Sequence, residues 1–78
     1  MSHPTTLVEW KQYISTLSGE ALRSKAVAAN SYRFVQTLQG EGYSASEING
    51  IFKMLASQFV RTGQMPPTGG YLDFQELI

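Results

Sequence analysis

The chain has 78 residues, 42% of them hydrophobic, which favours a single globular domain around one core and argues against wholesale disorder. Six basic residues balance six acidic ones, and the basic residues stand singly along the chain. A protein that works mainly by neutralising phosphates usually shows a basic excess or cluster, and the absence of cysteine excludes disulfides, thiolate metal sites and thiol nucleophiles.

The first expected element is a helix over residues 6–18. Its apolar residues recur near the helical period and fall on one side: Leu7, Trp10, Ile14 and Leu17, with Tyr13 beside them. Thr6 and Glu9 have the T-x-x-E form of a capping box, in which each side chain satisfies the other's free backbone N–H. Gly19 follows where a left-handed residue would close the helix.

The second expected element is a long helix over residues 20–39. One face collects Val27, Ser31, Phe34, Val35 and Leu38, with Ala28 at its edge. Its middle, KAVAANS, is rich in small residues that would let a neighbouring helix approach closely. Gly40 and Gly42 are expected to end it.

The third expected element is a helix over residues 44–62. Ser44 and Glu47 form a second capping box, S-x-x-E. An apolar stripe follows at positions i, i+3, i+4, i+7 and i+11: Ile48, Ile51, Phe52, Leu55 and Phe59. Gly63 is placed to stop the helix, and Pro66 and Pro67 forbid its continuation. No segment alternates like a strand, so the sequence predicts an all-α fold, a compact three-helix bundle.

The segment at 64–78 forms an apolar C-terminal extension of this single domain, residues 1–78. After the Pro and Gly residues come five large apolar side chains, Tyr71, Leu72, Phe74, Leu77 and Ile78. Such a cluster is seldom left in water. We expect it either to pack back across the helices, with a short fourth helix as one arrangement, or to dock on another chain.

Residues 42–55, GYSASEINGIFKML, resemble in part the turn and second helix of the helix-turn-helix DNA-binding family. With Gly42 as the turn glycine, Ile48 and Ile51 occupy the apolar positions six and nine residues later. Leu38 stands where the family has a small residue, and Glu41 stands at an expected apolar position. The resemblance covers about twenty residues and implies an alternative function, a dimeric DNA-binding regulator.

The outward face of the third expected helix decides how strong this alternative is. It would present Ser46, Asn49, Gly50, Lys53, Ser57 and Arg61. Asn49 has the chemistry to address adenine, and Lys53 and Arg61 to meet phosphates. That set is too small to hold a monomer on DNA at physiological salt, although a symmetric dimer would double it.

Catalytic chemistry has few candidate residues. His3 is the single histidine and lies beside Pro4 near the N-terminus, where nothing holds its geometry. The carboxylates show no close-paired metal-ligand spacing: Glu9, Glu20, Glu41, Glu47, Asp73 and Glu76. No serine lies in a nucleophile elbow, and LQGEG lacks the Lys-Ser/Thr of a phosphate loop. We therefore expect no enzymatic activity, no small-molecule substrate, no metal and no cofactor.

We expect a cytoplasmic protein, because no stretch approaches the roughly 18 apolar residues of a membrane span and the opening MSHPTTLVEW lacks signal-peptide regions. The leading hypothesis is an interaction module: an adaptor, assembly factor or inhibitor that binds another protein or itself. Accessory proteins of phages and mobile elements are often built this way, an analogy of size and type. The predicted partner-binding residues are Tyr71, Leu72, Phe74, Leu77 and Ile78 of the tail, with Gly50, Lys53, Ser57 and Arg61 of the third helix.

Overall fold

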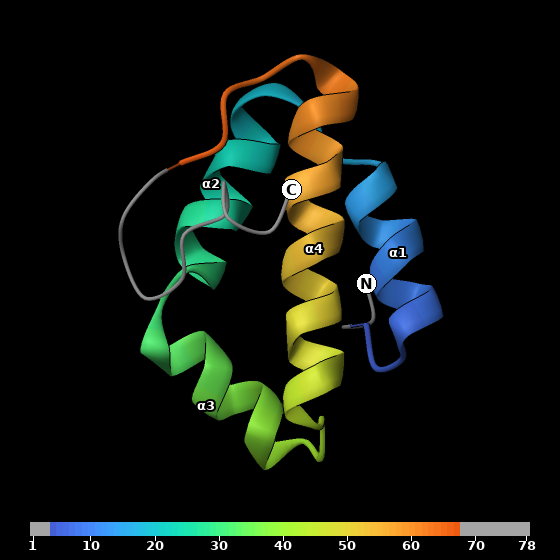
Figure 1. The fold of residues 1–78 in the computed structure, drawn as a ribbon, viewed down its shortest axis with the longest axis vertical. Coiled ribbons are helices and arrows are strands. Elements are labelled where there is room, and N and C mark those ends of the chain that lie inside the picture. Colours follow the sequence, from blue (N-terminus) through green and yellow to red (C-terminus); the bar gives the residue numbers. More distant parts are fainter. Residues whose placement is uncertain (1–3, 68–78) are drawn as a thin grey trace.

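The computed structural model describes residues 4–67, and within them the chain forms four α-helices and no strand (Figure 1). The helices are α1 (Leu7–Ser15), α2 (Gly19–Ala29), α3 (Tyr32–Gly40) and α4 (Ala45–Thr62). The prediction of a compact all-α protein is confirmed. Of the predicted C-terminal extension, residues 68–78, for which docking or a short extra helix was expected, lie outside the described residues.

The helix predicted over residues 20–39 is wrong in one respect: the chain breaks it into α2 and α3 at Asn30 and Ser31. Ser31 is extended, with φ −135° and ψ 152°, and its hydroxyl accepts a hydrogen bond from the Phe34 N–H at 3.3 Å. The same hydroxyl donates to the Ala28 carbonyl at 2.9 Å, so it binds the end of α2 and the start of α3 together. Serine and asparagine favour such positions because their side chains compete with helical backbone bonds.

The break changes which residues of this region face the core. Val35 and Leu38 of α3 are buried as expected, but Val27, predicted on the same face, is 57% exposed. α2 instead buries Leu22, Ala26 and Ala29, so its small residues face the other helices. The separate turn thus gives α2 and α3 independent orientations toward α4.

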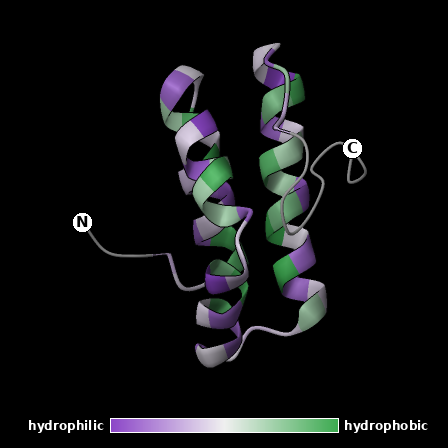
Figure 2. Ribbon diagram, turned by 90° about the vertical axis from the view of Figure 1, so that its left-hand side faces the viewer, coloured by the Kyte–Doolittle hydropathy of each residue, from purple (hydrophilic) through white to green (hydrophobic). Residues whose placement is uncertain are grey.

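α4 is the centre of the fold. It contacts α1, α2 and α3, with α1 on one side and α2 and α3 on the other (Figure 1). Hydrophobic residues gather where the helices face one another (Figure 2). The largest fully buried side chains are Trp10, Phe52, Phe59, Ile14, Leu22, Leu38, Ile51 and Leu55. The ring of Phe34 stands edge-on to both Trp10 and Phe52, at centroid distances of 5.9 Å in each case.

The ends of α4 follow the sequence prediction. Ser44 Oγ accepts from the Glu47 N–H at 3.2 Å, and the Glu47 carboxylate accepts from the Ser44 N–H at 2.9 Å, which completes the capping box. Gly63 closes the helix in the left-handed region, with φ 73°. At α1 the box is only half formed, because the Glu9 carboxylate accepts from the backbone N–H of Thr5 at 3.4 Å and not from that of Thr6.

Candidate functional site

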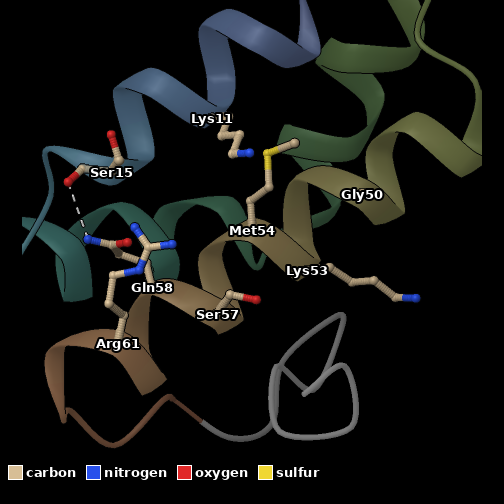
Figure 3. A pocket seen from close by; sticks show the side chains of 8 residues that line it. All are labelled: Lys11, Ser15, Gly50, Lys53, Met54, Ser57, Gln58 and Arg61. Atoms are coloured by element: carbon tan, nitrogen blue, oxygen red, sulfur yellow. Dashed lines mark hydrogen bonds between the residues drawn. The ribbon is translucent and has the colours of Figure 1, made fainter.

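A groove of about 280 Å³ lies on the surface between α1 and α4 (Figure 3). Its lining consists of Lys11 and Ser15 from α1 and Gly50, Lys53, Met54, Ser57, Gln58 and Arg61 from α4. The α4 residues recur at i, i+3, i+4, i+7, i+8 and i+11, so they form a stripe beside the stripe that faces the core. All four predicted binding residues of this helix lie together in the groove. The five predicted tail residues lie outside the described part of the chain.

Gln58 fixes α1 against α4 at one end of the groove. Its side chain is buried, and its Nε2 donates to the Leu17 carbonyl at 2.9 Å and more weakly to the Ser15 carbonyl at 3.4 Å. Carbonyls at the end of a helix lack an intrahelical partner, and this amide reaches the carbonyl of Ser15, the last residue of α1, and that of Leu17 in the turn that follows. The groove therefore has a wall whose position is set by a buried hydrogen bond.

The floor of the groove is open because it carries small side chains. A Cβ built at Gly50 would meet no heavy atom within 4 Å, so packing within the described chain does not require glycine there. Ser15 and Ser57 add only hydroxymethyl groups. Met54 is half-buried against the core and supplies an apolar wall that can adapt to what it contacts. A backbone or side chain of another molecule can approach α4 closely at Gly50.

The charges around the groove are all positive. Lys11, Lys53 and Arg61 line it, no carboxylate does, and within residues 4–67 none of the three pairs with one. Figure 3 shows Lys11 extending toward Met54 and Arg61 lying over Gln58, whereas Lys53 points outward. An occupant that brings carboxylates or other anionic groups would find three available cations.

The residues of the helix-turn-helix pattern have structural roles in the fold. Gly42 is in the left-handed region, with φ 97°, and Ile48 and Ile51 are buried. The hydroxyl of Tyr43 accepts a hydrogen bond from Trp10 Nε1 at 3.1 Å, which ties the turn to α1.

Comparison of the chain with protein-family models, curated proteins and solved structures finds no match.

The carboxylate of Glu9 lies outside the groove, in the cap of α1. Hydrogen bonds from the side chain and then the backbone of Thr5, with a further contribution from Thr6, hold the pKa of Glu9 below its ordinary value. Glu9 is thus part of the α1 cap.

In the range 4–67 no three His, Cys, Asp or Glu side chains gather into a metal-binding group. No helix of that range has the length and apolar character needed to span a membrane.

Four lining residues are not among the predicted binding residues: Lys11, Ser15, Met54 and Gln58. Lys11 and Ser15 are four residues apart and so share a face of α1, but only the packing of α1 on α4 brings that face to the groove. Gln58 did leave a signal, because it lies seven residues after Ile51 and three after Leu55. A polar residue at core spacing indicates a buried hydrogen bond.

Proposed function

We propose that this chain is a non-enzymatic interaction module, acting as an adaptor, assembly factor or inhibitor, whose α1–α4 groove receives a segment of a partner protein. The observation that carries the proposal is the groove itself, with an open floor at Gly50 and three cations without a carboxylate among its lining residues. The tail residues Tyr71, Leu72, Phe74, Leu77 and Ile78 complete the proposed surface as a prediction from sequence.

The size of the groove supports a segment-binding role. Pockets for drug-sized ligands measure about 300–1,000 Å³ and enclose most of the ligand, whereas this groove, at about 280 Å³, lies open along a helix. A stable protein interface buries roughly 1,200–2,000 Å² in total. The groove would supply the centre of such an interface, and a second surface, such as the apolar tail, would supply the rest.

Site-specific photo-crosslinking tests the proposal in the cell that makes the protein. A photoreactive amino acid in place of Ser57 would stand in the groove, and the same amino acid in place of Ser24, an exposed residue of α2, is the control. We expect a protein adduct from position 57 and none from position 24. Adding Lys53→Glu and Arg61→Glu to the chain with the photoreactive residue at position 57 should abolish its adduct. No adduct at 57, or equal adducts at both positions, would refute the proposal.

DNA binding is the second candidate, and one observation favours it: the structure adds Lys11 to the two cations already expected on this face of α4. In a symmetric dimer, contacts from all three in both copies to phosphates would give log K against log salt a slope of about −5.4. Mobility shifts with duplex DNA across a salt series measure that slope, and Lys53→Ala, which removes one contact from each copy, should flatten it by about 1.8. No shift at low salt, or protein adducts alone at position 57, would eliminate this candidate.

A further inference from the structure

The charged residues are distributed unequally between residues 4–67 and residues 68–78. Residues 4–67 hold all six Lys and Arg but four of the six carboxylates, a net charge of +2. Residues 68–78, TGGYLDFQELI, hold the other two, Asp73 and Glu76, and no cation. They also contain a cluster of large apolar residues, which matches the open floor and the Met54 wall of the groove. The chain therefore contains both a basic groove and an acidic, apolar segment suited to it.

We propose that the groove of one copy receives residues 71–77 of a second copy, with the carboxylates of Asp73 and Glu76 facing the groove cations. This rests on the proposed function and deepens it by naming the partner. Lys53 and Arg61 are eight residues apart on α4, about 12 Å along its axis. Three residues of extended chain span about 10 Å, so the two carboxylates can match the spacing of the two cations.

The path of the described chain favours a second copy over the chain's own tail. After α4, Gln64 exchanges two hydrogen bonds with the backbone of Gly19, at 2.9 and 3.1 Å, and Arg23 donates to the Met65 carbonyl at 3.3 Å. These contacts hold the chain at the start of α2, on the side of α4 away from α1 (Figure 1).

A tail that stayed in its own copy would have to cross α4 to reach the groove. From Pro67 to Tyr71 the chain spans at most about 14 Å, whereas the path around half of a helix of about 10–12 Å diameter is about 16–19 Å. The first apolar anchor, Tyr71, would then lie at the far edge of α4 rather than inside the groove. In a second copy the approach is free of this limit. Two such contacts made reciprocally would close a symmetric dimer and bury both tails.

Charge reversal in the full-length chain tests the proposal by sedimentation equilibrium over a wide concentration range. The groove variant carries Lys53→Glu and Arg61→Glu, and the tail variant carries Asp73→Lys and Glu76→Lys. We expect the native chain to form a dimer and each variant alone to raise the dimer Kd by about tenfold or more, because like charges then face each other. An equimolar mixture of the two variants should restore a dimer containing one copy of each. Arg33→Glu, on α3 and outside the groove, should leave the native dimer unchanged.

Three outcomes would overturn the inference. One is a native chain that stays monomeric at every concentration, and another is a mixture that fails to associate while both variants remain folded by circular dichroism. The third concerns the melting temperature of monomeric variants. If it is restored only when both charge reversals are in the same chain, the tail docks within a single copy. A monomer that still gives adducts with another protein from position 57 defeats this inference and leaves the proposed function standing. A monomer that gives no adducts defeats both.

Discussion

Replacing Gly50 with alanine should stabilise the fold, because α4 gains a better helix former without a steric cost. The added Cβ would meet no heavy atom within 4 Å, and Gly50 is not among the glycines with positive φ. Glycine in a helix interior costs about 0.5–1 kcal/mol relative to alanine. We expect the free energy of unfolding to rise by that amount, which corresponds to an increase in melting temperature of about 2–8 °C for a chain of this size.

Urea unfolding followed by fluorescence of the single, fully buried Trp10 measures the change. The midpoint should rise while the dependence on denaturant stays the same. Gly40→Ala is the matched control, because its Cβ also meets open space but it stands at the last position of α3, where the gain should be smaller. A lower midpoint for Gly50→Ala would show that the surroundings of this residue are occupied, and the description of an open groove floor would fail.

A larger substitution at the same position separates folding from binding. Leucine is nearly as good a helix former as alanine, so Gly50→Leu should keep the fold while its side chain fills the groove. The crosslink from position 57 should then be lost in a protein of at least native stability. If the adduct persists, the partner does not approach α4 at Gly50. Opposite effects on stability and binding are common at functional sites.

Three further predictions concern contacts that shape the fold. Gln58→Leu should lower the free energy of unfolding by about 1–3 kcal/mol, because the buried Leu17 carbonyl loses its donor; an unchanged urea midpoint would contradict this role. Ser44→Ala should cost about 1 kcal/mol through loss of the α4 cap. Ser18→Ala, at an N-cap without a side-chain hydrogen bond, should cost much less, and equal losses would contradict the comparison. The pKa of Glu9 is lowered in the fold, so its contribution is present above the unfolded-state pKa and is lost as pH falls from that value through the lower pKa of the folded state. The melting temperature of the native chain should approach that of Glu9→Gln over this window, and a constant difference between them would contradict the role of the cap.

The parts of the fold that local chemistry determines were predictable from the sequence. The Ser44–Glu47 box, the apolar stripe of α4 and the left-handed Gly63 each depend on residues within a turn or two of one another. The break between α2 and α3 was missed because periodicity continued through it. Ser31 kept the helical phase of its neighbours, and its capping role becomes visible only when its hydroxyl is found bound to both helix ends.

The groove was predictable only on the α4 side. The positions of Gly50, Lys53, Ser57 and Arg61 follow from the period of a single helix. The opposite wall depends on the angle and register at which α1 packs, and these are set by interactions between residues about 40 apart in the sequence, such as Gln58 with Leu17. The core spacing of Gln58 indicates a buried hydrogen bond but not its partner, so Lys11 could not be assigned to the site before the structure was known.

Folding gives no account of Gly50, Lys53 and Arg61 in the groove, and this is the physical reason for proposing that they bind a partner. Three helices surround the core stripe of α4, and each of its large residues there is buried. The adjacent stripe holds a glycine that weakens the helix and two cations that pair with no carboxylate among residues 4–67. In a small domain with modest stability, positions that do not serve the fold are where local propensity and function are expected to disagree. A carboxylate-bearing segment against Gly50 would resolve that disagreement, since the open floor would admit its backbone and the cations would gain partners.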